Sequence, residues 1–372
     1  MMLPPMRRLH LFNPSHDEAL AAHTPYYYPA RAARMLGNDL AVLPAWWAAP
    51  GDAVLLPDAV ELPPADFTGK GIRFLHLKDL RGGEAMDFEE ICPWGWDALL
   101  VHQLQAARLA PDLLPDAEQL EVIRQLSSRE TAVQLLHALR DTLKEGCGTS
   151  SWCTSESAVW TAVEHYGAAM LKAPWSSSGR GVFAVHFPPN DNQRRRVEKL
   201  LREQGGVEVE PFYTRVQDFA AEFQIVDHHT TYLGLSVFTT TENGGYTGNR
   251  IGGTPFLESQ LPATIRQQLP AVIAALQTQL DRLVAPHYQG PLGIDMMVVG
   301  EDDGTLVLHP CIEINLRRTM GHVALALQPL LPEGHTGIYR IQPVKSPLKQ
   351  EENCIALTPQ AKEMEAVLIL EG

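Results

Sequence analysis

Short apolar segments alternate with helical segments over the first third of the sequence, and this alternation constrains the fold more than any other feature. The later segments ALLVHQLQAARL and AEQLEVIRQL have the apolar spacing of helices. Strands that alternate with helices favour a layered arrangement with a parallel sheet. The sequence therefore predicts an α/β domain with a parallel sheet over residues 1–125. Four segments in it end at a proline or a charged turn and are predicted strands: RLHLFNP, LAVLP, DAVLLP and IRFLHL.

A second segment, predicted over residues 126–206, combines helices with a hairpin. In LSSRETAVQLLHALRDTLKEG, either Ser127 or Ser128 can cap a helix. The strands AAMLKAP and GVFAVHF are joined by a tight serine-glycine loop, which predicts a β-hairpin. NDNQRRRVEKLLREQGG then predicts a covering helix, and its RRR run indicates a solvated helix face in preference to a phosphate site.

Residues 207–330 form the segment that is richest in predicted strands. DHHT at residues 227–230 is predicted to be a hairpin turn. Residues 331–372 are predicted to be a loop-like extension that ends in a short helix at PQAKEMEAVLIL. Alternation and β-branched or aromatic content support five strands in residues 207–330: GVEVEPFY, DFAAEFQIV, TYLGLSVFTT, GPLGIDMMVV and TLVLHPCIEIN.

Composition restricts the partners and the compartment of the protein. The chain has 372 residues and a formal net charge of -14, and it therefore lacks the basic footprint that nucleic acids and anionic membranes attract. It has no run of about 18 apolar residues, and MMLPPMRRLHLFNP lacks the features of a signal peptide. Its five cysteines form no CxxC pair, which suits a reducing compartment. We therefore expect a cytoplasmic protein with no nucleic-acid partner and no membrane association.

Several common nucleotide and hydrolase motifs are absent from the sequence. It contains no GxxxxGK[ST], no GxGxxG after a strand, no HExxH and no GxSxG. A P-loop NTPase, a dinucleotide-binding enzyme, a zincin and an α/β-hydrolase are therefore not favoured.

The segment CIEINLRRTMGH is the most informative motif for chemistry. Residues two apart in a strand face the same side, so Glu313, Asn315 and Arg317 are expected to project together. Asp295, in GPLGIDMMVV, reaches the same face if the two strands pair as a hairpin. Carboxylate and amide oxygens suit Mg²⁺, and an arginine nearby suits a phosphate. The alternative is the polar outer face of a hairpin, but the apolar surroundings of both strands count against it.

Two further motifs are compatible with nucleotide binding. In LKAPWSSSGRGV, Lys172 ends a strand, and the backbone N–H groups of the loop after it can cradle phosphate oxygens. In GGVEVEPFY, a strand exits into a loop whose backbone can recognise a base edge. A carboxylate from Glu210, Asp218 or Glu222 can then hold ribose hydroxyls. Each motif alone is unspecific.

In their order along the chain, LKAPWSSSGRGV, then GGVEVEPFY, then Asp295 with CIEINLRRTMGH, these motifs resemble the ATP-grasp superfamily over roughly residues 125–325. The resemblance implies an ATP-grasp fold of two α+β subdomains, with residues 126–206 as the small or lid subdomain and residues 207–330 as the large one. It implies ATP and one or two Mg²⁺ ions as cofactors, with Mn²⁺ as a substitute.

The sequence departs from the family pattern in several places. Arg129 stands where lysine is more usual, Ala-Pro in place of Pro follows Lys172, YTRVQDFAAEF stretches the hinge, and the gap from Asp295 to Glu313 is long. None of these departures removes a metal ligand.

The resemblance also assigns roles to residues. Arg129 and Lys172 would contact ATP, and Arg317 would face the transferred phosphoryl group. The metal ligands would be Asp295, Glu313 and Asn315. The flap would be Ser178, Gly179, Arg180 and Gly181, and the adenine hinge would be Glu210, Pro211 and Phe212.

Candidate substrate residues lie outside these motifs. Arg250, in the predicted glycine-rich loop TENGGYTGNRIGG, can hold a carboxylate or be a plain surface arginine. In FNPSHDEALA, a helix cap at Ser15 followed by acids in the first turn is preferred to substrate contacts by His16, Asp17 and Glu18.

The activity implied by the resemblance is that of an ATP- and Mg²⁺-dependent carboxylate–amine ligase. Such an enzyme activates a small carboxylate as an acyl phosphate, which an amine or another nucleophile then attacks. Two alternatives stay open: a nucleotide-binding ATP-grasp protein without catalysis, and a small-molecule phosphotransferase. A homodimer is compatible with the resemblance, because dimers are common among similar proteins.

Overall fold

The computed structural model describes residues 7–64, 67–81, 88–143, 146, 148–176, 181–240, 246–344 and 353–372. The chain forms two compact units. Unit 1 comprises Met1–Glu121, Thr247–Gly253 and Arg317–Gly372, and unit 2 comprises Val122–Tyr246 and Thr254–Leu316. The finer division into four segments stays a prediction.

A parallel sheet forms the first half of unit 1, as the alternation of strands and helices predicted. Its strands are β1 (Arg8–Leu11), β2 (Ala53–Leu56), β3 (Arg73–His76) and β4 (Glu90–Pro93), in the order β3-β2-β1-β4. All three neighbouring pairs are parallel. One face buries an apolar cluster that includes Leu9 and Leu104, and another cluster includes Val54 and Val42. Burial on both faces is what a parallel sheet requires.

Short helices connect the strands of this sheet. The predicted strand LAVLP is wrong: it begins at Leu40, the residue that caps the C-terminus of α2 (Arg31–Asp39), and ends in η1 (Leu43–Trp46), a 3-10 turn with Pro44 as its second residue. The α4 helix begins after Asp97, whose side chain accepts a hydrogen bond from the Leu100 N–H at 2.9 Å. The other helical elements of this region are α1 (His16–Ala22), α2 (Arg31–Asp39), α3 (Leu77–Arg81), α4 (Ala98–Ala106), η2 (Pro111–Leu113) and α5 (Ala117–Leu126).

The second half of unit 1 is antiparallel. The strands β14 (Thr336–Pro343) and β16 (Met364–Glu371) pair along their lengths, with β11 (Tyr246–Ile251) beside β14 and β15 (Cys354–Ala356) beside β16. The predicted loop-like extension with a terminal helix is therefore wrong. EAVLIL is apolar at almost every position, so periodicity alone cannot separate a strand from a helix there. Two helical elements precede β14: α11 (Met320–Leu327) and η3 (Gln328–Leu330).

Asp39 ties the start of β16 to α2 within unit 1. Its carboxylate accepts hydrogen bonds from the backbone N–H groups of Lys362, Glu363 and Met364 at 2.8, 3.0 and 2.9 Å. Asp39 is buried, and a buried carboxylate requires such donors.

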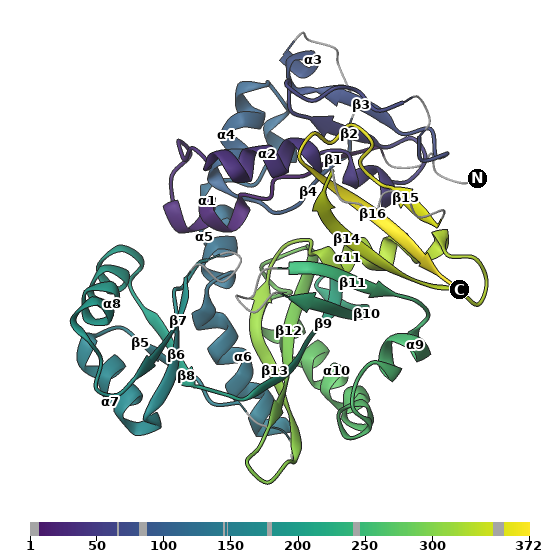
Figure 1. The fold of residues 1–372 in the computed structure, drawn as a ribbon. Coiled ribbons are helices and arrows are strands. Elements are labelled where there is room, and N and C mark those ends of the chain that lie inside the picture. Colours follow the sequence, from purple (N-terminus) through teal and green to yellow (C-terminus); the bar gives the residue numbers. More distant parts are fainter. Residues whose placement is uncertain are drawn as a thin grey trace. The chain divides into compact units, whose positions relative to one another are not determined.

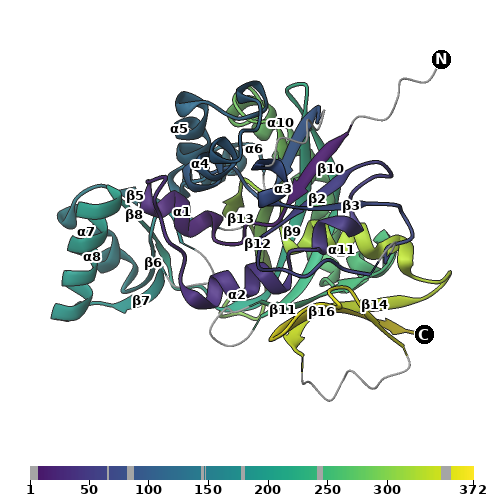
Figure 2. The same cartoon turned by 90° about the horizontal axis from the view of Figure 1, so that it is seen from above.

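Unit 2 contains a small antiparallel sheet covered by two helices. Its strands are β5 (Ser151–Cys153), β6 (Ala168–Lys172), β7 (Val182–His186) and β8 (Val207–Pro211), in the order β5-β8-β6-β7. The pairing of β6 with β7 confirms the predicted hairpin. Both views show α7 (Glu156–Tyr166) and α8 (Asp191–Gln204) packed on the same side of this sheet (Figures 1 and 2). Arg194, Arg195 and Arg196 of α8 are exposed, which confirms the solvated face.

The larger sheet of unit 2 has the order β13-β12-β9-β10. Its strands are β9 (Arg215–Val226), β10 (His229–Thr240), β12 (Gly290–Gly300) and β13 (Leu306–Asn315), and all of them were predicted. The turn at Asp227 and His228, with φ values of 50° and 62°, confirms the hairpin at DHHT. The helices α6 (Arg129–Thr142) and α10 (Ala263–Leu283) pack against this sheet, and the short α9 (Thr254–Ser259) contacts β10 (Figure 1). In the described parts of the chain, no helix is both long and apolar enough to cross a bilayer.

Candidate functional site

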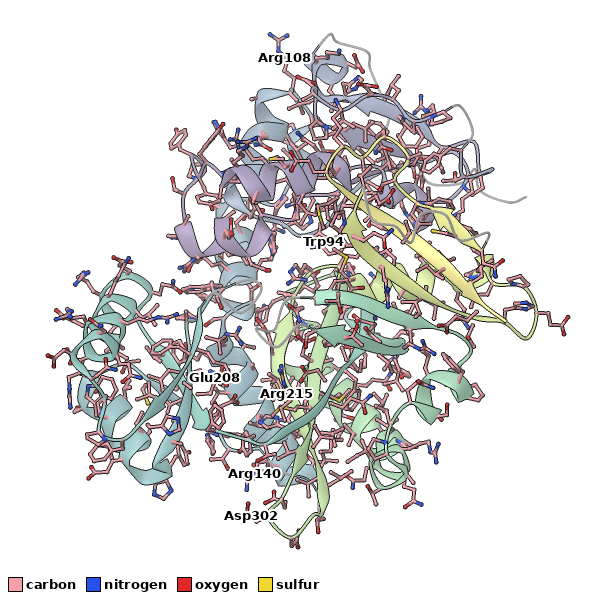
Figure 3. All side chains as sticks on the ribbon, viewed as in Figure 1. Trp94, Arg108, Arg140, Glu208, Arg215 and Asp302 are labelled. Carbon is pink, nitrogen blue, oxygen red and sulfur yellow. The ribbon has the colours of Figure 1, made fainter. Side chains whose placement is uncertain are left out.

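Lys172, Glu208 and Glu210 form a buried ionic cluster in the small sheet of unit 2. Lys172 ends β6 directly opposite Glu208 in β8, and Glu210 lies two residues further on the same face. The Nζ atom of Lys172 lies 3.2 Å from Oε1 of Glu208 and 2.8 Å from Oε2 of Glu210. Figure 3 labels Glu208 on this sheet. All three side chains are almost fully buried, so water does not stabilise their charges.

One ammonium group cannot neutralise two buried carboxylates. Burial acts to lower the pKa of Lys172, but Glu208 and Glu210 together raise it above its ordinary value. Burial raises the pKa of Glu210 to about 7, although Lys172 acts in the opposite direction. The cluster therefore holds Lys172 charged and favours a proton on Glu210 below about pH 7.

His309 of β13 borders this cluster and is fully buried. Its Nε2 lies 3.9 Å from Oε2 of Glu210, and neither ring nitrogen has a hydrogen-bond partner among the described residues. Burial, together with the charge of Lys172, lowers the pKa of His309 to about 3. The Ser150 hydroxyl donates to Oε1 of Glu208 at 2.8 Å, and Tyr213 packs edge-on against His309 at 5.4 Å. His309 is therefore a neutral polar side chain at the edge of the cluster.

Sequence reasoning missed Glu208, His309 and Ser150. The alternation in VEVEP carried a signal for Glu208, because a residue two positions before Glu210 must share its face. No local pattern marks His309 or Ser150, since both reach the cluster from other elements.

The hinge predicted at Glu210, Pro211 and Phe212 lies at the end of β8. Phe212 follows the strand, donates its N–H to the Ala168 carbonyl at 3.1 Å, and is 49% exposed. Its side chain therefore remains accessible next to the buried cluster.

Arg129 begins α6 after the cap residue Ser128, whose hydroxyl accepts from the Glu130 N–H at 3.2 Å. Of the two predicted cap residues, the structure selects Ser128. The guanidinium of Arg129 is buried and lies 2.9 Å from Oε1 of Glu313. Its Nε donates to the Ala173 carbonyl at 3.0 Å. Arg129 thus joins the end of β6 to a predicted metal ligand.

Asp295 and Glu313 lie directly opposite each other in the antiparallel pair of β12 and β13, as the hairpin prediction required. Asn315 lies two residues beyond Glu313, opposite Gly293. Residues opposite each other share one face, with about 5 Å between their Cβ atoms. All three side chains are partly exposed. Two carboxylates and an amide on one accessible face fit the oxygen ligands that Mg²⁺ prefers.

The predicted set supplies only part of a metal coordination shell. Within the described ranges of the chain, no three His, Cys, Asp or Glu side chains converge as a metal site. Mg²⁺ usually takes one or two carboxylates and fills its shell with water and substrate phosphate. The residues present therefore fit a metal that enters together with a phosphate ligand.

The register of β9 distinguishes between the two candidate ribose ligands, Glu222 and Asp218. Glu222 lies opposite Gly293 of β12, and Asn315 lies opposite Gly293 on its other side. Glu222 is therefore in one cross-strand row with a predicted metal ligand. Asp218 lies further along β9 and pairs with Arg215 at 3.1 Å, and burial raises its pKa. This register favours Glu222 over Asp218.

The base of the serine-glycine loop is closely packed. Ser178, Gly179 and Arg180 lie outside the described residues. Gly181 accepts the Ala173 N–H through its carbonyl at 2.9 Å, and a Cβ at Gly181 would come within 2.4 Å of the Ser176 Cβ. A side chain at Gly181 would therefore force this hairpin apart.

Two predicted arginines belong to unit 1, and each is paired with a carboxylate of that unit. Arg317 donates from Nε and NH2 to the two carboxylate oxygens of Asp17 at 2.9 and 2.8 Å. Arg250 lies 3.2 and 3.1 Å from the two carboxylate oxygens of Glu371. Arg250 lies on β11, so the predicted loop is a strand at this position.

The preferred cap at Ser15 is not formed by its side chain. Ser15 precedes α1, but it makes no side-chain hydrogen bond there. The acid Asp17 pairs with Arg317 instead, and His16 Nδ1 lies 3.2 Å from Oδ2 of Asp97.

No family model and no curated protein matches the chain. Solved structures do match over nearly its whole length. N5-carboxyaminoimidazole synthetase from Staphylococcus aureus, in complex with ADP, is 12% identical, with a TM-score of 0.54 over 100% of this chain and 94% of that one. Biotin carboxylase from Campylobacter jejuni, in a β,γ-ATP complex, is 12% identical, with a TM-score of 0.56 over 99% and 88%.

A third match is the biotin carboxylase domain dimer of the Hydrogenobacter thermophilus 2-oxoglutarate carboxylase, with MgADP, ADP and bicarbonate. It is 12% identical, with a TM-score of 0.56 over 100% of this chain and 87% of that one. These neighbours are ATP-grasp proteins, so the predicted ATP-grasp fold is confirmed.

Proposed function

We propose that the protein is an ATP- and Mg²⁺-dependent ligase that joins a small carboxylate to an amine or another nucleophile. The observation that carries this proposal is the pair of carboxylates, Asp295 and Glu313, opposite each other in an ATP-grasp fold, with the charged Arg129 next to Glu313. Oxygen ligands and a fixed cation are the two needs of phosphoryl transfer.

Different residues of the chain would bind the phosphates, the adenine and the ribose of the nucleotide. Lys172 and Arg129 supply positive charge for the phosphates, and the backbone of Glu210 to Phe212 supplies the adenine hinge. Glu222 is the proposed ribose ligand. Mg²⁺, held by Asp295, Glu313 and Asn315, would neutralise charge on the phosphate oxygens. The flap residues Ser178 to Gly181 would exclude water, as an acyl phosphate requires.

The proposed reaction has two steps. A carboxylate oxygen of the substrate attacks the γ-phosphorus of ATP, the bond to the bridging oxygen breaks, and ADP leaves. The amine nitrogen then attacks the acyl carbon, phosphate leaves, and the nitrogen loses a proton. Arg317 is proposed to face the phosphoryl group and Arg250 to bind the substrate carboxylate. For either arginine, such a ligand would replace the carboxylate it now contacts.

The comparisons support a nucleotide and a small carboxylate as substrates. The three neighbours bind ADP or a β,γ-ATP, and one was solved with bicarbonate and as a dimer. By analogy, we propose small-molecule substrates and a homodimer for this protein. A cytoplasmic location is proposed from the five cysteines, which form no CxxC pair and suit a reducing compartment. Transfer of phosphate to a hydroxyl group is the second candidate, because the same charges can donate to another oxygen.

The decisive experiment compares the wild-type protein with Glu313→Gln. Mg²⁺-dependent ATP binding is measured by calorimetry, and ADP release is measured with a panel of amino acids and small acids. We expect Glu313→Gln to lose most Mg²⁺-dependent binding and all ADP release. Glu301→Gln, in the exposed turn of the same hairpin, is the matched control and should behave like the wild type. Equal binding in all three proteins, with no ADP formed from any acid, would sink the proposal.

Product analysis separates the two candidate activities. A ligase turns over to an amide, and its acyl phosphate is trapped by hydroxylamine as a hydroxamate. A phosphotransferase yields a stable phosphate ester and no hydroxamate.

A further inference from the structure

Arg129 is held by several contacts that do not depend on Glu313. Its Nε donates to the Ala173 carbonyl at 3.0 Å, and its backbone N–H donates to the Pro174 carbonyl at 3.1 Å. Its NH2 lies 3.4 Å from the Ser176 hydroxyl. The side chain is 5% exposed and therefore has little room to move. The guanidinium stays in front of Glu313 whether or not the carboxylate pairs with it.

This placement puts the guanidinium of Arg129 close to any divalent cation that binds Glu313. Arginine keeps its charge at every working pH, so it cannot leave the site by losing a proton. Its NH2 already contacts Oε1 of Glu313 at 2.9 Å. A divalent ion that binds Glu313 must displace this contact and remain close to a fixed positive charge. The guanidinium of Arg129 is buried whereas Glu313 is 28% exposed, so such repulsion is stronger than in bulk water.

We propose that Arg129 competes with the divalent cation for Glu313 in the nucleotide-free protein, and that nucleotide phosphate relieves this competition by taking over the guanidinium. This inference rests on the proposed function and adds an order of binding to it. Metal alone binds weakly, and metal and nucleotide strengthen each other. The coupling is reciprocal, so nucleotide alone also binds more weakly than nucleotide with metal.

The test measures Mn²⁺ binding directly, without turnover. Free Mn²⁺ is followed by electron paramagnetic resonance during titration of the full-length protein, with and without saturating ADP. In the wild type, ADP should tighten Mn²⁺ binding by about tenfold or more, within the usual range of coupling between sites. In Arg129→Gln, Mn²⁺ alone should bind about fivefold tighter than in the wild type, and the effect of ADP should shrink.

The control is Arg140→Gln, at the other end of the same helix. Arg140 is exposed and donates to the Thr149 hydroxyl at 2.7 Å, and Figure 3 labels it on α6. This variant should titrate like the wild type. The proposal is overturned if Arg129→Gln binds Mn²⁺ alone with unchanged or weaker affinity. If Arg129→Gln does not fold, the wild type decides, because absence of synergy between ADP and Mn²⁺ also overturns the proposal.

The same titrations separate this inference from the proposed function. A tighter Mn²⁺ affinity in Arg129→Gln supports the competition even if no acid on the panel releases ADP. ADP release with unchanged Mn²⁺ affinity supports the ligase and overturns the competition.

Discussion

The Nζ atom of Lys172 lies 2.8 Å from Oε2 of Glu210, inside a sheet where both side chains are almost completely buried. Glu208 adds a second carboxylate at 3.2 Å. A buried charge is tolerated only when a partner compensates it, so the stability of this sheet depends on Lys172.

Replacing Lys172 by Met should therefore be strongly destabilising. The substitution leaves Glu208 and Glu210 buried without their cation, and breaking a buried pair costs about 3–5 kcal/mol. Denaturant unfolding at pH 8 measures the free energy of unfolding. Adding Glu208→Gln to the variant should restore part of the loss. The control Lys199→Met changes a lysine that is 65% exposed on α8, and it should change stability by no more than about 0.5 kcal/mol. A loss no larger than that at Lys172 would contradict the role of the cluster.

His309 should make the protein sensitive to acid. Its pKa is lowered from 6.5 to about 3, so the unfolded chain binds a proton that the folded protein excludes. Stability contributed by the neutral ring is thus complete above about pH 6.5 and is lost as the pH falls toward 3. In His309→Gln, this part of the pH dependence should disappear. Unfolding curves measured between pH 8 and pH 4 test this, with the exposed His335→Gln as the control. Parallel pH profiles for wild type and His309→Gln would refute the assignment.

Asp295→Asn should separate binding from stability. The variant loses one of the two opposed carboxylates, and even the loss of a hydrogen-bond partner of a metal ligand typically lowers metal affinity about 10- to 100-fold. Affinity for Mg²⁺ with ADP should therefore fall about ten- to a hundredfold. Stability without metal should change much less than the affinity, because the substitution also removes the repulsion between two carboxylates directly opposite each other in the sheet. Calorimetry and thermal unfolding measure the two effects. Asp302→Asn, in the exposed turn of the β12–β13 hairpin (Figure 3), should change neither. An Asp295→Asn protein that keeps its affinity would exclude this residue as a ligand.

Asp39→Asn should loosen the last strands of unit 1. The amide has one acceptor oxygen in place of the two that bind three N–H groups, and it loses the charge. Charge-assisted hydrogen bonds are the stronger class, so we expect a loss of about 2 kcal/mol. Hydrogen exchange should accelerate at Lys362 to Met364 before it does so elsewhere. Asp141→Asn, exposed on α6, is the control. Unchanged protection of residues 362–364 would show that Asp39 does not hold them.

The alternation of apolar and polar residues predicted strands and their side-chain faces best where one face of a strand is polar and the other apolar. GPLGIDMMVV and TLVLHPCIEIN each place a polar residue within an apolar pattern, and this was enough to place Asp295 beside Glu313. The parallel sheet followed in the same way from the alternation of strands and helices. The strand at EAVLIL could not be predicted in this way, because it is buried on both faces and its residues therefore do not alternate between apolar and polar.

The pairing of charges could not be predicted from local patterns. Arg129, Arg317 and Arg250 were assigned to ligands, and each also contacts a carboxylate of the chain. Those partners are distant in sequence and meet the arginines only through the fold. The same holds for His309, which reaches Glu210 from another sheet.

The discontinuity of unit 1 has a consequence for how the protein is made. Unit 2 is finished in the chain at Leu316, whereas the last strand of unit 1 ends at Glu371. During synthesis, the partner of Asp39 emerges only after the whole of unit 2 has left the ribosome. Chains released before that strand is complete would carry a finished unit 2, and a unit 1 in which β14 can pair with β11 but lacks its second neighbour, β16.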